Sequence, residues 1–165
     1  MKPLKIIEWR GARYYVTRSY PFLAEVADRA VRRHLEGVEP KKICGVDVVG
    51  APLIIKREEP ITHFFRGVFI PRPTAIVLTP IVTYDAFWHE VVHYMQLCLE
   101  MCDVKLFMLK YEENPSLYEE AARRWWVILE KQIDVAERKK VEEEVKRARY
   151  ELQKDVWKIE VSTSP

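Results

Sequence analysis

Residues 87–97 place the strongest constraint on this chain, because they contain one complete HExxH motif formed by His89, Glu90 and His93. On a helix, side chains four residues apart project from one face, so the two imidazoles can bind a single zinc ion. Glu90 lies about 100° further round the helix, close enough to take a proton from a metal-activated water. The motif predicts a helix with hydrolytic zinc chemistry, although the same residues also occur as ordinary polar positions of amphipathic helices.

The composition is that of one globular domain without a strong electrostatic preference. The chain has 27 Lys plus Arg and 25 Asp plus Glu, so its formal charge of +2 gives no case for a nucleic-acid partner. No apolar run approaches the roughly 20 residues that span a bilayer, and residues 1–10 lack the apolar core of a signal peptide. We therefore expect a single domain, 1–165, that is cytoplasmic and has no membrane partner.

The cysteines Cys44, Cys98 and Cys102 form an odd set without paired metal-finger spacing. This pattern argues against a secreted disulfide scaffold and against a Cys-rich zinc site, and we expect Cys98 and Cys102 to lie in the core. Charged residues make up 32% of the chain, which has a single Asn, a bias reported for hyperthermophile proteins. A thermophilic source is a hypothesis on these grounds, and it would be compatible with an intracellular disulfide.

Residues 1–82 are expected to form a hairpin, a helix and a small sheet. Alternating residues around a turn at Gly11 predict a hairpin over 5–18. Helical spacing then runs to Gly37, with Ser19 as the expected N-cap. Beyond residue 42, short β-rich runs separated by prolines predict a largely antiparallel sheet with strands at 43–49, 53–56, 61–70 and 74–78.

The last of these runs is flanked by Pro73 and Pro80. Because proline cannot donate a ladder hydrogen bond, flanking prolines suit an edge strand whose free backbone groups pair with an extended peptide. The alternative is an edge that proline merely protects from pairing. On the first interpretation, the substrate contacts three residues of this strand: Ile76, Val77 and Leu78.

The second half of the chain is expected to be helical. The HExxH helix and a following helix occupy 83–133, with the second N-cap at Asn114 or Ser116. From Ser116 to Ile159 no Gly or Pro interrupts the helical sequence. Because a single helix of that length would be unusual in so small a domain, we expect a break near 132–134 and a final helix over 134–160. The apolar stripe of this C-terminal helix can pack on the domain or form a homodimer.

A hydrolytic zinc site needs a third protein ligand and an open position for water. The candidates are four downstream carboxylates and one upstream imidazole: Glu112, Glu113, Glu119, Glu120 and His63. Either residue of the Glu119–Glu120 pair would, alone, be taken for a solvated carboxylate near a helix N-terminus.

Two segments together resemble the gluzincin metallopeptidases, especially their small single-domain members: His89-Glu90-x-x-His93-x-x-Gln96 and Asn114-Pro115-x-x-x-Glu119-Glu120-Ala121. The resemblance implies an α+β, zincin-like fold in which a small sheet with an edge strand packs on the HExxH helix. It also implies that the third ligand comes from a Glu-Ala pair on a second helix. Glu120, before Ala121, matches that ligand, and Glu119 is its neighbour.

The chain departs from the gluzincin pattern in one respect. Many gluzincins place an Asp shortly after the ligand Glu to orient a zinc-bound His, whereas here Ala122, Arg123 and Arg124 follow. The residue that stabilises the transition state is also open among four candidates: Tyr94, Tyr111, Tyr118 and His63.

These observations predict a zinc metallopeptidase that cleaves a peptide or unfolded-protein substrate. An alternative is a catalytically silent interaction module that uses its C-terminal helix. A third hypothesis combines the two: the C-terminal helix covers the cleft and keeps the enzyme latent.

Overall fold

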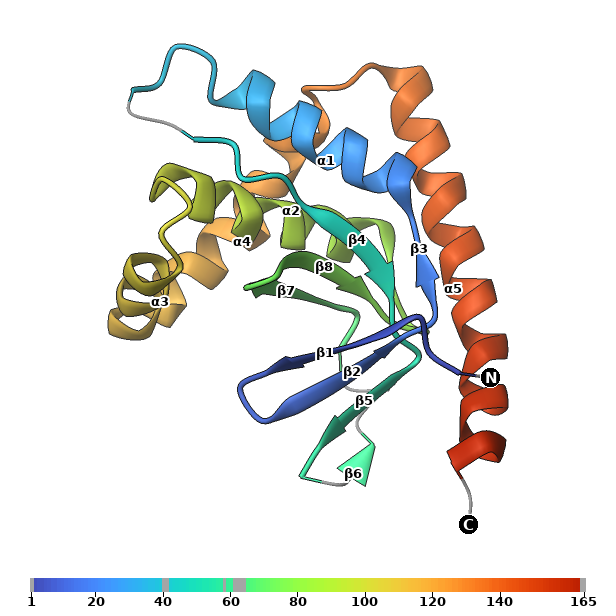
Figure 1. The fold of residues 1–165 in the computed structure, drawn as a ribbon. Coiled ribbons are helices and arrows are strands. Elements are labelled where there is room, and N and C mark those ends of the chain that lie inside the picture. The colour runs from blue at the N-terminus through green and yellow to red at the C-terminus, as the bar shows by residue number, and fades with distance from the viewer. Residues whose placement is uncertain (1, 40–41, 58, 61–64, 164–165) are drawn as a thin grey trace.

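The computed structural model describes residues 2–39, 42–57, 59–60 and 65–163. Within these ranges the chain forms an α+β fold of five helices and eight short strands (Figure 1). The strands form two four-stranded sheets rather than the single sheet that the sequence predicts.

The first sheet, here called the outer sheet, is antiparallel throughout and has the order β1-β2-β5-β6. The predicted hairpin is confirmed, with its turn at Arg10 and Gly11, both at positive φ. The strands of the outer sheet are β1 (Lys5–Trp9), β2 (Ala12–Val16), β5 (Leu53–Lys56) and β6 (Glu59–Pro60).

The second sheet, here called the central sheet, has the order β3-β4-β8-β7 and is mixed, because β4 and β8 run parallel. Its strands are β3 (Arg18–Ser19), β4 (Asp47–Gly50), β7 (Gly67–Pro71) and β8 (Thr74–Leu78).

The predicted edge strand is not at an edge. β8, which carries Ile76, Val77 and Leu78, lies between β4 and β7. Val77 faces the outer sheet, whereas Ile76 and Leu78 face the helices, so the strand is buried on both sides. An unbroken apolar run is typical of such a strand, and the flanking prolines lie outside its ladder. The edge beside the HExxH helix is β7.

The helices pack on the face of the central sheet opposite the outer sheet (Figure 1). The predicted break near 132–134 is confirmed, and the HExxH helix has Thr83 as its N-cap. Ser19, in contrast, belongs to β3, and Tyr20 is the N-cap of the first helix. The helices are α1 (Pro21–His34), α2 (Tyr84–Leu99), α3 (Val104–Glu113), α4 (Pro115–Glu130) and α5 (Val135–Thr163).

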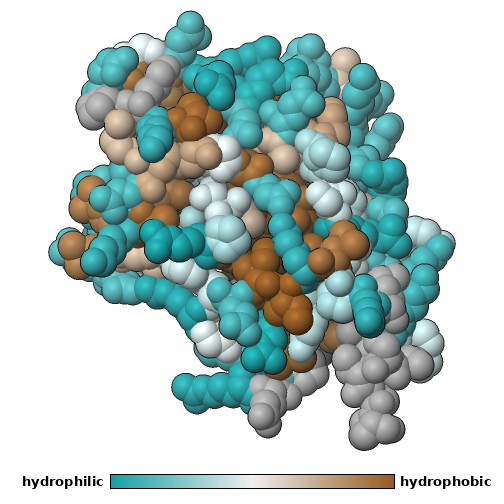
Figure 2. All heavy atoms as spheres, in the orientation of Figure 1, coloured by the Kyte–Doolittle hydropathy of each residue, from teal (hydrophilic) through white to brown (hydrophobic). Residues whose placement is uncertain are grey.

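The apolar stripe of α5 packs on its own domain. Leu152 is fully buried, and a Cβ at Gly50 of β4 would lie only 2.5 Å from its Cδ2. Asp155, also fully buried, accepts hydrogen bonds from Thr17 and Arg18. The viewer-facing surface of α5, on the right of Figure 2, is largely hydrophilic. A homodimer through α5 would therefore have to use its outer face, and it stays a prediction.

Among the described residues, no helix combines the length and the apolar character needed to cross a membrane.

Candidate metal centre

The HExxH motif lies in the middle of α2, a helix surrounded by other elements on most sides. The four-residue spacing stacks His89 and His93 one turn apart, with ring centroids separated by 4.9 Å. The His93 side chain is 7% exposed and the His89 side chain 23% exposed. The pair therefore lies at the boundary between the core and the solvent.

Glu119 of α4 completes the cluster. Its two carboxylate oxygens lie 2.6 Å from His93 Nε2 and 3.6 Å from His89 Nε2. One ligand atom from each of the three residues lies within 4.8 Å of the others. Two imidazole nitrogens and one carboxylate oxygen are the protein donors of many hydrolytic zinc sites, so the residues fit this metal.

Glu120, the expected third ligand, lies outside this cluster. Its carboxylate pairs with Arg123 and Arg124 at 3.1 and 2.9 Å, and its side chain is 47% exposed. Neighbouring residues of a helix are separated by about 100°, so only one member of the Glu119–Glu120 pair can face α2. The packing of α4 on α2 selects Glu119.

The other candidates for the third ligand also lie elsewhere. Glu112 and Glu113 are exposed in the last turn of α3, where Glu112 pairs with Arg10 of the hairpin. His63 lies outside the described residues. Of the two N-caps predicted for α4, Asn114 and Ser116, the structure has Asn114. Its side chain accepts a hydrogen bond from Leu117 N–H.

Gln96, three residues beyond His93 on α2, holds the His93 ring through a side-chain hydrogen bond. Its Nε2 donates to the Tyr118 carbonyl at 3.2 Å, which fixes the direction of the amide. Its Oε1 therefore faces His93 Nδ1, at 2.8 Å, and can only accept a hydrogen bond. His93 must carry a proton on Nδ1, and Nε2 is left as the metal-binding nitrogen.

Without a metal, the cluster is held by opposite charges. Burial alone would lower the pKa of His93, but the hydrogen bond that His93 donates to Glu119 and the charge of Glu90 outweigh it and raise that pKa. Burial acts to raise the pKa of Glu119, yet hydrogen bonds from His89 and His93 bring it well below its usual range. A metal cation would replace the imidazolium proton as the partner of Glu119.

Glu90 is almost completely buried beside the two imidazoles. Burial raises its pKa, whereas the neighbouring imidazoles and a hydrogen bond from the Phe69 backbone N–H act to lower it. A Cβ at Gly67 would lie 3.3 Å from Glu90 Cγ, so glycine lets β7 approach this side chain closely. The candidate base therefore lies in direct contact with β7, the edge strand of the central sheet among the described residues.

A cleft of about 370 Å³ opens over the cluster. Its walls come from the β1–β2 hairpin, β7, α2 and α3, and most of the lining side chains are apolar or aromatic. No described residue of α5 lines it, so this geometry does not support a C-terminal helix that covers the site. The lining includes Trp9, Tyr14, Phe65, Phe69, Phe107 and Tyr111.

The structure separates the candidate tyrosines. Tyr94 is fully buried, where its hydroxyl donates to Asp28 at 2.5 Å. Tyr118 packs against Tyr111 and Phe107. Only Tyr111, among the three, lines the cleft, where burial and the nearby Glu119 raise its pKa. A neutral hydroxyl at this position can donate to an oxygen that gains negative charge.

Two features of the site were not predicted from the sequence. Gln96 belongs to the quoted segment His89-Glu90-x-x-His93-x-x-Gln96. Only its position three residues after His93 indicated that its side chain could contact the His93 ring. The role of β7 depends on strand order, which short apolar runs do not specify.

Neither a comparison with protein-family models nor searches of curated proteins and solved structures found a match for this chain.

Proposed function

We propose that this protein is a zinc-dependent metallopeptidase of the gluzincin type. The observation that carries the proposal is the convergence of His89, His93 and Glu119 beside the buried Glu90. The nearby free edge of β7 supports a peptide as substrate, because an extended chain can pair with an unpaired strand.

His89, His93 and Glu119 would hold the metal. Zinc, when bound, supplies a Lewis acid that acidifies a water molecule and polarises the scissile carbonyl. Glu90 takes the proton of the attacking water and later delivers it to the leaving amine. The raised pKa of Glu90, due mainly to its burial, suits a group that both accepts and returns a proton.

The remaining residues position the substrate. The edge of β7 aligns the peptide backbone, in place of the β8 residues expected from the sequence. Tyr111 donates a hydrogen bond to the carbonyl oxygen as negative charge develops on it. The aromatic lining of the cleft favours peptides with a large apolar side chain next to the scissile bond.

Cleavage of a quenched-fluorescence peptide library by the zinc-loaded protein tests this function. The variant Glu90→Gln keeps the shape and burial of the side chain but cannot accept a proton. We expect it to bind zinc as the wild type does and to cleave about 10²–10⁴ times more slowly.

The matched control is Glu120→Gln, which alters a neighbouring exposed carboxylate outside the cluster. Its cleavage rate should stay close to that of the wild type. Equal cleavage by wild type and Glu90→Gln, with zinc bound to both, would refute the proposed mechanism.

A further inference from the structure

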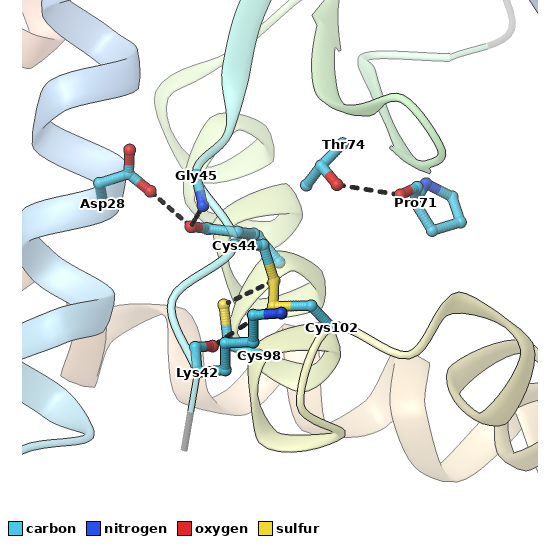
Figure 3. Close-up of a disulfide and its surroundings, with 9 residues drawn as sticks. Asp28, Lys42, Cys44, Gly45, Pro71, Thr74, Cys98 and Cys102 are labelled. Carbon is cyan, nitrogen blue, oxygen red and sulfur yellow. Dashed lines mark hydrogen bonds between the residues drawn. A yellow bond between two sulfur atoms is a disulfide. The ribbon is translucent and has the colours of Figure 1, made fainter.

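A second group of metal-ligating side chains gathers at the other end of α2 (Figure 3). Cys98 lies in the last turn of the helix, Cys102 follows just after it, and Cys44 comes from the segment before β4. Cys44 and Cys102 form a disulfide, and the sulfur of the free, buried Cys98 lies 3.5 Å from that of Cys44. The three sulfurs all lie within 4.8 Å of one another.

Direct exchange between the Cys98 thiol and the disulfide is not favoured by this arrangement. A thiolate attacks a disulfide along the line of the sulfur–sulfur bond, which is about 2 Å long. Attack on Cys44 along that line would place Cys98 and Cys102 sulfurs roughly 5.5 Å apart. They are within 4.8 Å, so the three atoms form a triangle instead of a line.

A triangle of sulfurs is the arrangement that a thiolate metal site requires. Tetrahedral zinc with Zn–S bonds near 2.3 Å holds its sulfurs roughly 3.8 Å apart, close to the 3.5 Å between the Cys98 and Cys44 sulfurs. The Cys44 and Cys102 sulfurs, which are bonded to each other in the oxidised protein, would have to separate to a similar distance on reduction. The spacing of Cys98 and Cys102, Cys-x₃-Cys, also falls within that of structural zinc sites. The sequence argues against a Cys-rich site because the three cysteines include only one such pair, and the third sulfur comes from a distant segment.

We propose that Cys44, Cys98 and Cys102 form a thiolate site for a zinc ion when the disulfide is reduced. A dithiol or phosphine reductant supplies two electrons, and cleavage of the disulfide gives two thiols that join Cys98. Binding of the cation then displaces the thiol protons to solvent. A small-molecule disulfide that accepts two electrons by thiol–disulfide exchange, and leaves as two thiols, would re-form the Cys44–Cys102 bond and release the metal.

The segment that carries Cys44 is held in place independently of the sulfurs. Gly45 N–H donates to the Tyr94 hydroxyl at 2.8 Å, and that hydroxyl donates to Asp28 of α1 (Figure 3). The loop, α1 and α2 therefore keep Cys44 close to Cys98 after reduction. The metal would maintain the tether between this loop and the end of α2 under conditions that remove a disulfide.

Cobalt(II) provides a probe that separates this site from the His89–His93–Glu119 cluster. Thiolate-to-cobalt charge transfer absorbs in the near ultraviolet, whereas a site of nitrogen and oxygen donors has no such band. The full-length protein is reduced with a phosphine under anaerobic conditions, and reduction is verified by titration of three thiols per chain. We expect the band to saturate at one cobalt per chain, to disappear on addition of zinc, and to be absent from the oxidised protein.

Cys98→Ala tests the third ligand while keeping the Cys44–Cys102 disulfide, so its fold is checked in the oxidised state by thermal unfolding. After reduction, this variant should bind cobalt about a hundredfold more weakly, because each ligand supplies a large share of the binding free energy. Cys98→Ser serves as a second variant if the alanine form is poorly folded. Absence of the band from the reduced wild type, or equal cobalt affinity of the folded Cys98 variant, would overturn the proposal. This inference does not rest on the peptidase function.

Discussion

The middle of α2, which we call the histidine end, and the C-terminal end of α2, the cysteine end, carry the same residue spacing with different results. His89 and His93 lie four residues apart within regular helix and share one face of it. Cys98 and Cys102 have the same separation, but α2 ends at Leu99, and Met101 and Cys102 adopt positive φ values of 56° and 62°. The chain reverses there, and Cys102 reaches Cys44 instead of the next turn of a helix.

The surroundings of the two clusters also differ. The histidine cluster has nitrogen and oxygen donors and opens to a cleft, as a site needs if it is to admit water and substrate. The cysteine cluster has sulfur donors and joins a loop to the helix end, away from the lining of that cleft. The two clusters therefore share a residue spacing but differ in access, because only the histidine cluster lines the cleft.

The largest effect is expected on zinc affinity, when each of the two neighbouring glutamates, Glu119 and Glu120, is replaced in turn. Glu119→Ala should weaken zinc binding by roughly a thousandfold, because it removes one of three ligands. Glu120→Ala should change the affinity less than about threefold, since it removes only exposed ion pairs. Competition with a chelating dye measures both, and the opposite order of the two variants would restore Glu120 as the ligand.

At the cysteine end, the disulfide is expected to act on stability and not on catalysis. Cys102→Ser opens a loop of 58 residues and should lower the free energy of unfolding of the oxidised protein by about 4 kcal/mol. Denaturant titration measures this change, with Cys98→Ala as the control that keeps the disulfide. A large loss of zinc affinity at the histidine end in folded Cys102→Ser would show that the two ends are coupled.

An intermediate effect is expected for Gln96, which positions His93. Gln96→Leu should weaken zinc binding by about 10–100-fold, because the imidazole loses the acceptor that orients it. Gln96→Glu also offers an acceptor and should recover most of the affinity. If leucine and glutamate lowered affinity equally, Gln96 would have only a packing role.

The smallest effect concerns the pH dependence of the zinc-free protein. The pKa of His93 is raised in the folded protein. Its contribution to the free energy of unfolding is therefore complete below about pH 6.5 and is lost as the pH rises through the higher folded pKa. The pKa of Glu119 is lowered in the folded protein. Its contribution to the free energy of unfolding is therefore complete above about pH 4.5 and is lost as the pH falls through the lower folded pKa. Between these limits, Glu119→Gln should cost about 1 kcal/mol of stability.

Thermal unfolding across pH 3–9 in the presence of a chelator measures the contribution of this pair. The difference between wild type and Glu119→Gln should be largest between the two limits and should shrink on both sides. A difference that does not vary with pH would mean that the His93–Glu119 charges do not stabilise the zinc-free fold.

Much of the local structure followed from the sequence for identifiable reasons. The hairpin around Gly11 and the limits of 53–56 and 74–78 were predicted correctly, because alternation and turn residues act over a few positions. The HExxH helix and the break before α5 were also correct, since uninterrupted helical spacing is a strong local signal.

The errors concern residues whose roles depend on distant segments. β8 was predicted at an edge because prolines flank it, but its position depends on pairing with β4, some 28 residues earlier in the chain. Cys44 and Cys102 were not predicted to meet, because their pairing requires the loop before β4 to pack on the end of α2.

The helix that presents His89, Glu90 and His93 could be predicted from the sequence alone, because any α-helix places side chains four residues apart on the same face. The sequence also limited the candidates for a third ligand to four downstream carboxylates and the upstream His63. The packing of distant elements brings Glu119 rather than Glu120 beside the two histidines, sets Gln96 between His93 and Tyr118, and puts β7 at the edge of the central sheet among the described strands. Local geometry fixes the side of a helix or strand from which a side chain projects. The residue that this side chain contacts depends on how distant helices and strands pack together.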